Sequence, residues 1–111
     1  MITTHVLDTA LGRPARAVPV CLDLLDNHAW RELGSGTTDD DGRIRTLTKP
    51  GPVNNGRYRL VFDTAAYFKA LGAATCFFPT IEIQFDIVDG SGHVHVPLLL
   101  SPFGYSTYRG S

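Results

Sequence analysis

Residues 81–87 have the sequence Ile-Glu-Ile-Gln-Phe-Asp-Ile, and this stretch decides the fold class. Apolar and polar side chains alternate along it without a break, which is the pattern of a half-buried β-strand whose successive side chains point to opposite faces of a sheet. The same period of two recurs in residues 18–24, 57–62 and 93–100, with turn-forming residues between them. The side chains predicted to face the core on these strands are Val18, Val20, Leu22, Leu24, Tyr58, Leu60, Phe62, Ile81, Ile83, Phe85, Ile87, Val94, Val96, Leu98 and Leu100.

Shorter strands and one helix complete the predicted fold. The short strands are expected near His5, Trp30, Arg43 and Tyr105. Residues 63–72 favour a helix instead, because Asp63 or Thr64 can cap its first turn and Gly72 can end it. Many short strands with one short helix predict a mainly β protein, a two-sheet β-sandwich. No linker or internal repeat divides the chain, so residues 1–111 are expected to form a single domain.

The composition restricts the class of protein. The chain has 111 residues, 43% of them hydrophobic, which suits a globular core and excludes disordered and fibrous classes. Its 10 basic and 11 acidic residues give a net charge of -1, without the one-signed field that binds nucleic acids or membrane surfaces. No apolar run could span a bilayer and no secretory signal is visible, so a cytoplasmic protein is expected. Cys21 and Cys76 have no evident partner base and are expected to be structural.

The strand over residues 93–100 carries two histidines on its outer face. Alternation places His93, His95, Pro97 and Leu99 opposite the core. Apolar residues beside histidine are unusual on a solvated surface, which suggests that another subunit covers this face. Either histidine taken alone could equally be a surface or cross-strand packing residue, and His93, beside Gly92 at the strand end, is expected to contribute little.

A zinc site is the alternative interpretation of these histidines. His93 and His95 could be two ligands, with His5 or His28 as the third. The spacing is weak support, because any residues at positions i and i+2 share one face of a strand. No acidic residue lies near them in sequence to orient the rings, so metal is not expected.

The acidic run over residues 37–42 is better interpreted as a turn than as an ion site. It resembles the start of a calcium loop, but Thr48 stands where such a loop needs a bidentate glutamate. Asp41-Gly42 instead predicts a hairpin turn that delivers Arg43 onto the next strand. An arginine at this position has a functional role if a carboxylate or a planar anionic ligand lies opposite its guanidinium, which can bind such a group through two hydrogen bonds. These residues alone therefore indicate a β-sandwich, an oligomer and a covered face with histidines.

Four segments add a family resemblance that spans essentially the whole chain. They are residues 4–8, 38–43, 95–102 and 105–111. Together they resemble the 5-hydroxyisourate hydrolases, the enzymatic relatives of transthyretin. The ending Tyr-Arg-Gly-Ser separates those hydrolases from the hormone-carrying transthyretins, and this sequence departs from the pattern at none of the motif positions.

The resemblance implies a fold, an assembly and a site. The fold is a sandwich of two four-stranded sheets with one short helix, and the assembly is a homotetramer, a dimer of dimers, whose central channel holds the sites. The site residues that carry over are His5, Arg43, His95, Tyr108, Arg109, Gly110 and Ser111. His5 and His95 would activate water and handle the proton, Arg43 would stabilise the developing oxyanion, and Ser111 would shape the closed end of the site. The resemblance thus implies four catalytic residues, which are His5, Arg43, His95 and Ser111. The residues that it implies for substrate binding are His5, Arg43, Tyr108, Arg109 and Gly110.

The implied reaction is the hydrolysis of 5-hydroxyisourate to 2-oxo-4-hydroxy-4-carboxy-5-ureidoimidazoline on the route from urate to allantoin. It needs no metal and no cofactor, because water can be activated by a histidine. The alternative is a transthyretin-like protein that binds a small aromatic ligand without catalysis. A β-sandwich adhesion or carbohydrate-binding domain is a more distant third possibility.

Overall fold

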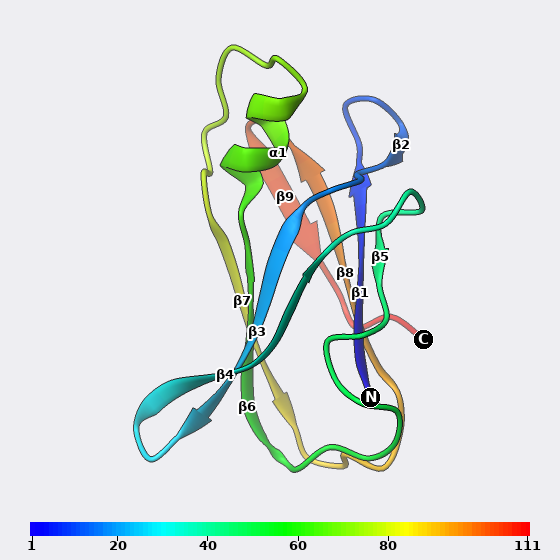
Figure 1. The fold of residues 1–111 in the computed structure, drawn as a ribbon, viewed down its shortest axis with the longest axis vertical. Helices are drawn as coiled ribbons and strands as arrows, with labels where there is room; N and C mark the ends of the chain where they lie inside the picture. The colour runs from blue at the N-terminus through cyan, green and yellow to red at the C-terminus, as the bar shows by residue number, and fades with distance from the viewer.

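The computed structural model describes all of residues 1–111 and consists of two packed β-sheets with one helix at one end (Figure 1). The elements are β1 (Ile2–Asp8), β2 (Arg13–Pro14), β3 (Pro19–Asp26), β4 (Ala29–Thr37), β5 (Arg43–Ile44), β6 (Gly56–Phe62), α1 (Thr64–Ala70), β7 (Ile81–Ile87), β8 (Val94–Ser101) and β9 (Gly104–Thr107). All the strands expected from the sequence are present, including the short ones near His5, Trp30, Arg43 and Tyr105. The single helix is neither long nor apolar enough to cross a membrane.

The two sheets confirm the predicted sandwich. One sheet has four antiparallel strands in the order β4-β3-β6-β7. The other has the order β2-β1-β8-β9, and β5 also pairs with β1, so this sheet has five strands where the resemblance implied four. The extra strand arises because β2 and β5 are two residues each and divide the free edge of β1 between them: β2 pairs at Leu7 and Asp8, and β5 pairs at Thr4 and His5.

The strand that matters most for the site is β8, because both ends of the chain lie against it. β1 pairs with β8 in parallel, with Thr3 opposite His95 and His5 opposite Pro97. The amide of Val94 donates to the carbonyl of Met1 at 2.9 Å, and residue 110 at the other end forms an isolated bridge with His95. Figure 1 accordingly shows the two termini near each other, beside the start of β8.

The predicted apolar rows form the core between the sheets. Every side chain predicted to face inward is buried except Leu24 and Phe85, which are half-buried and pack against the core. Phe85 lines a cavity between β7 and β8, and its ring stacks on Tyr58 with centroids 5.8 Å apart. Leu24 lies near the end of β3, beyond the β-bulge at which Leu33 of β4 is left without a partner.

Helix α1 is tied to the five-stranded sheet through one buried carboxylate. Asp63 caps the helix by accepting from the amide of Ala66 at 3.0 Å, as predicted, and Gly72 adopts a φ of 74° just beyond its end. Tyr67 donates its hydroxyl to Asp8 at 2.6 Å, and Asp8 is 1% exposed. Burial and this bond raise the pKa of Tyr67. The end of β1 is therefore fixed, which fixes the register of the histidine earlier on the same strand.

Candidate active site

Three neighbouring strands bring His5, Arg43 and His95 to the outer face of the five-stranded sheet. His5 on β1 lies directly opposite Arg43 on β5. His5 and His95 both point away from the core, since the even-numbered neighbours Val6, Val94 and Val96 are the buried ones. The imidazole centroids of His5 and His95 are 6.5 Å apart and the ring planes differ by 31°. The three residues expected to do the chemistry are thus adjacent in the fold, although up to 90 positions separate them in the sequence.

The acidic turn before β5 holds Arg43 in place, but it is not the predicted hairpin turn, because β4 belongs to the four-stranded sheet and β5 pairs with β1 in the other one. One carboxylate oxygen of Asp39 accepts from the amides of Asp41 and Arg43, each at 2.9 Å, and these bonds contribute to the lowered pKa of Asp39. Gly42 has a φ of 75°, and a Cβ there would lie 2.4 Å from the carbonyl oxygen of Val6. Only glycine fits this approach of the turn to β1. Asp39 is therefore engaged in positioning Arg43.

Arg43 differs from its neighbour Arg45 in having no carboxylate partner. Arg45 lies 3.5 Å from Asp39, whereas the ion pairs of the molecule do not include the guanidinium of Arg43. Its donors are available to an anionic or strongly polar ligand at the two imidazoles.

Both imidazoles have lowered pKa values, for two shared reasons. The pKa of His5 lies below the ordinary 6.5 mainly because of burial and then because of Arg43, and the backbone of Asp41 and nearby carboxylates oppose the shift. The pKa of His95 is lowered first by burial and then by the positive charges of His93, Arg43 and His5. Both rings are therefore neutral near neutral pH, and a neutral imidazole can accept a proton from water.

A contact that the sequence did not reveal joins His95 of β8 to His93, which directly precedes that strand. The hydroxyl of Thr3 lies 2.6 Å from Nε2 of His93 and 2.7 Å from Nδ1 of His95. Thr3 is 3% exposed, so this hydroxyl is shielded from solvent. The parallel pairing of β1 with β8 produces the contact, and no local pattern in the sequence specifies that register.

The C-terminal tail reaches the same site through Gly110. Its amide donates to the carbonyl of His95 at 2.8 Å, which draws the tail across β8. A Cβ at this position would lie 2.6 Å from Cδ2 of His95 and 3.2 Å from Cγ of Pro97. The backbone of the tail therefore lies directly against the His95 ring, and Ser111 follows it as an exposed terminal residue.

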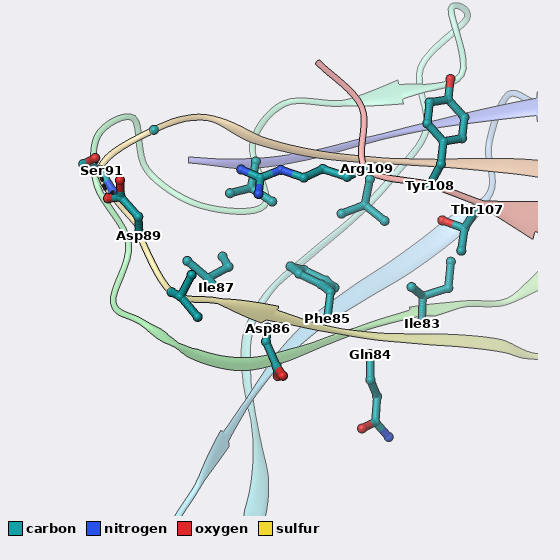
Figure 2. Close-up of a pocket in the computed structure, with 14 residues that line it drawn as sticks. Ile83, Gln84, Phe85, Asp86, Ile87, Asp89, Ser91, Thr107, Tyr108 and Arg109 are labelled. Atoms are coloured by element: carbon teal, nitrogen blue, oxygen red, sulfur yellow. Dashed lines mark hydrogen bonds between the residues drawn. The ribbon is translucent and has the colours of Figure 1, made fainter.

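Tyr108 and Arg109 border a separate cavity of about 560 Å³, between the edge strand β7 on one side and β8 and the tail on the other. The side chain of Arg109 extends over this cavity, whereas the ring of Tyr108 points away from β7 (Figure 2). Arg109 extends there toward the loop of Asp89 and Ser91 and contributes to the lowered pKa of Asp89, after the hydrogen bonds from Ser91. The structure thus brings together four of the seven predicted residues, places Ser111 directly after the fourth and directs Arg109 elsewhere; the four are His5, Arg43, His95 and Gly110.

The remaining reactive groups lie outside the cluster. No group of three or more His, Cys, Asp or Glu side chains is placed to hold a metal ion. His28, weighed as a third zinc ligand, lies in the turn between β3 and β4 of the other sheet. Burial and Glu32 raise the pKa of the Cys21 thiol to about 11, which disfavours the thiolate that nucleophilic chemistry needs.

Comparison with known proteins gives matches over the whole chain. The HIUase/Transthyretin family model matches residues 2–110. The 5-hydroxyisourate hydrolase of Salmonella typhimurium is 44% identical over 111 residues, which are 100% of this chain and 81% of that protein. The structure of Klebsiella pneumoniae 5-hydroxyisourate hydrolase is similar with a TM-score of 0.85 and 37% identity, covering 99% of this chain and 98% of that one.

Transthyretin itself is equally similar in fold. Sea bream transthyretin in complex with thyroxine has a TM-score of 0.90 and 33% identity, covering 98% of this chain and 93% of that one. The likeness to hydrolases and to transthyretin confirms both the resemblance and the transthyretin-like sandwich predicted from the sequence. The chain belongs to the HIUase/Transthyretin family.

Proposed function

We propose that this protein is an enzyme that hydrolyses 5-hydroxyisourate to 2-oxo-4-hydroxy-4-carboxy-5-ureidoimidazoline, a step between urate and allantoin. The observation that carries the proposal is the cluster itself: two neutral imidazoles with centroids 6.5 Å apart, beside an arginine without a carboxylate partner. The hydrolase relatives, 44% and 37% identical, support the choice of substrate.

The chemistry follows from what each group can do. One imidazole takes a proton from water as the water oxygen attacks the carbonyl carbon of the cyclic amide. Arg43 stabilises the negative charge that develops on the carbonyl oxygen. The C–N bond then breaks, and the imidazolium returns its proton to the departing nitrogen, so the product is the ring-opened carboxylic acid. The backbone of Gly110 and the terminal Ser111 form the wall of the site beside His95.

We further propose that the active form is a homotetramer, a dimer of dimers, with the sites in a channel between subunits. On the outer face beside the histidines, Leu7 pairs with Leu99 and both are half-buried, while Pro97 is buried. Such apolar residues around a reactive cluster favour coverage by a second copy. The role proposed for Arg109 in substrate binding requires this assembly, since its side chain extends over another cavity of its own subunit, and Tyr108 is proposed to bind substrate in the same channel.

The direct test is catalysis of substrate decay. Urate oxidase generates 5-hydroxyisourate freshly, and its ultraviolet absorbance is followed with and without the protein. We expect faster decay that persists after exhaustive chelation, since no metal is proposed. A decay rate equal to that of the buffer would refute the hydrolase. One zinc per subunit, with activity lost on stripping and regained on addition, would refute the metal-independent mechanism.

A cytoplasmic location is proposed with this function and is tested by cell fractionation.

A second candidate is ligand binding without catalysis, and the likeness to sea bream transthyretin in complex with thyroxine favours it. Calorimetry with small aromatic ligands tests it. Tight binding together with unaccelerated decay of 5-hydroxyisourate would support the binding protein over the enzyme.

A further inference from the structure

His95, Thr3 and His93 form a chain of hydrogen-bonded groups, and the proposed mechanism uses only His95. The hydroxyl of Thr3 contacts Nδ1 of His95 at 2.7 Å and Nε2 of His93 at 2.6 Å. Thr3 is nearly fully buried, whereas His93 is exposed. The chain therefore runs from the site, through a shielded hydroxyl, to the surface.

The single hydrogen of the Thr3 hydroxyl restricts the tautomers that His93 and His95 can adopt together. A threonine hydroxyl has one hydrogen, so it donates to one imidazole nitrogen and accepts from the other. If Thr3 donates to His95, then Nε2 of His95 carries the proton and cannot accept another. If Thr3 donates to His93, then Nδ1–H of His95 donates to Thr3, and Nε2 of His95 keeps a free lone pair. The tautomers of the two histidines are thus coupled through one hydroxyl.

We propose that Thr3 and His93 are positioning residues that hold His95 in the Nδ1–H tautomer and so present Nε2 as the base. This inference rests on the proposed function, because it names the base of the hydrolysis. Only this tautomer lets His95 accept a proton at Nε2 and still satisfy Nδ1–H, which donates to Thr3 before and after the transfer. The hydroxyl of Thr3 donates to His93 throughout, so no group of the chain has to rotate.

The charges around His95 explain why such support is useful. Arg43 from β5, His5 from β1 and His93 from the segment just before β8 all lie near it, and each disfavours the imidazolium. Gly110 of the tail contributes no side-chain charge, and the terminal carboxylate lies one residue beyond it. A fixed oxygen lone pair at 2.7 Å from Nδ1 stabilises the protonated ring during the reaction.

The first test reads the tautomer directly, by nitrogen-15 NMR of the histidine rings in the intact protein. We expect the proton of neutral His95 on Nδ1. In His93→Leu, Thr3 loses its acceptor and should donate to His95 instead, which moves that proton to Nε2. A proton on Nε2 of His95 in the unchanged protein would overturn the proposal. This readout does not depend on turnover, so it separates the failure of this inference from the failure of the proposed hydrolase.

The second test is kinetic and uses matched variants. Thr3→Val keeps the shape of the side chain without the hydroxyl, and should lower kcat about tenfold to a hundredfold with KM within about twofold. Thr3→Ser restores the hydroxyl and His93→Gln restores an acceptor, so each should recover most of the rate that Thr3→Val and His93→Leu lose. Circular dichroism checks that the variants fold. A folded Thr3→Val with unchanged kcat, or a Thr3→Ser as slow as Thr3→Val, would overturn the proposal.

Discussion

The outer faces of the two sheets follow the same alternation but use their charges in opposite ways. On the four-stranded sheet, Arg59 pairs with Asp23 at 2.7 Å and Glu82 at 3.1 Å, and its guanidinium lies 4.4 Å from the centroid of the Trp30 ring. On the five-stranded sheet, Arg43 has no such partner. A face whose charges satisfy one another stabilises the fold, whereas one that leaves donors and neutral bases without partners is suited to act on a ligand.

Deleting residues 108–111 should produce the largest effect. The deletion removes Gly110 from the His95 ring and Ser111 from the wall of the site, and we expect hydrolysis to be abolished. The fold should survive, because the core rows on β3, β7 and β8 do not include the tail. Circular dichroism, light scattering and substrate decay are compared with those of the intact protein. A folded truncation with near-normal turnover would remove the tail from the site.

Removing the imidazole of His5 or of His95 should have the next largest effect on turnover. His5→Ala and His95→Ala should each lower turnover by about a hundredfold or more, the usual scale for a positioned acid-base group. His28→Ala is the matched control from the other sheet and should leave turnover unchanged, since His28 is exposed in the β3–β4 turn. Equal losses at all three positions, or none at His5 and His95, would contradict the assignment.

A single methyl group at Gly110 tests how closely the tail contacts the base. Gly110→Ala should lower kcat by about tenfold or more, because the added carbon would approach Cδ2 of His95 to 2.6 Å and displace the ring. Gly92→Ala is the matched control, because a Cβ there has no heavy atom within 4 Å. Unchanged kcat in Gly110→Ala would mean that the position of the ring does not depend on the tail.

Acid should affect the two faces in separate pH ranges. The pKa values of His5 and His95 are below 6.5 in the folded protein, so the unfolded chain binds more protons as the pH falls below 6.5. The free energy of unfolding should therefore decline with falling pH from that point, whereas kcat/KM should decline only at lower pH, as the folded histidines become protonated. Asp86 on the other face has a pKa below 3.8, held there by Arg57, and its contribution is lost only at more acidic pH.

Urea titrations and initial rates across pH check this order. Replacing both histidines, as in His5→Gln with His95→Gln, should remove the part of the stability loss that begins below 6.5 and leave the more acidic part. A double variant that kept the whole pH dependence of stability would assign it to other groups.

The sequence predicted the features that depend on a local pattern, such as the direction of a side chain on its strand. It did not predict the contacts that depend on the register between distant strands. The outward direction of His95 and the delivery of Arg43 by its turn both follow from residues within a few positions. The contact of Thr3 with His93 could not be predicted, because it joins residues 90 positions apart through a parallel strand pair. His93, expected to contribute little as a strand-end residue, acquires a proposed role only through that contact.

The same limit applies to the tail and to the exposure of Phe85. β9 ends at Thr107, and the chain then turns to pair Gly110 with β8, which no alternation along β9 could predict. Period-two reasoning stops where the strand stops. Likewise, the pattern along one strand does not tell where a cavity remains between it and the facing strands, so the partial exposure of Phe85 was missed. The residues that define the chemistry were found by resemblance, and their geometry came from the pairing of distant strands.

The smallest effect on turnover is expected from Arg59→Gln, on the face that contrasts with the site. This arginine donates from Nε and Nη2 to one oxygen of Asp23 at 2.9 and 2.7 Å, and the Asp23 side chain is only 10% exposed. Without the guanidinium, that carboxylate keeps its charge in a poorly solvated position, which should lower the free energy of unfolding by about 1–3 kcal/mol. Turnover per folded molecule should not change, because the whole thickness of the core separates Arg59 from the imidazoles. Urea denaturation and substrate decay on the same preparation measure both. If turnover per folded molecule also fell, the two faces would be coupled through the core. The assignment of stability to one face and of catalysis to the other would then be wrong.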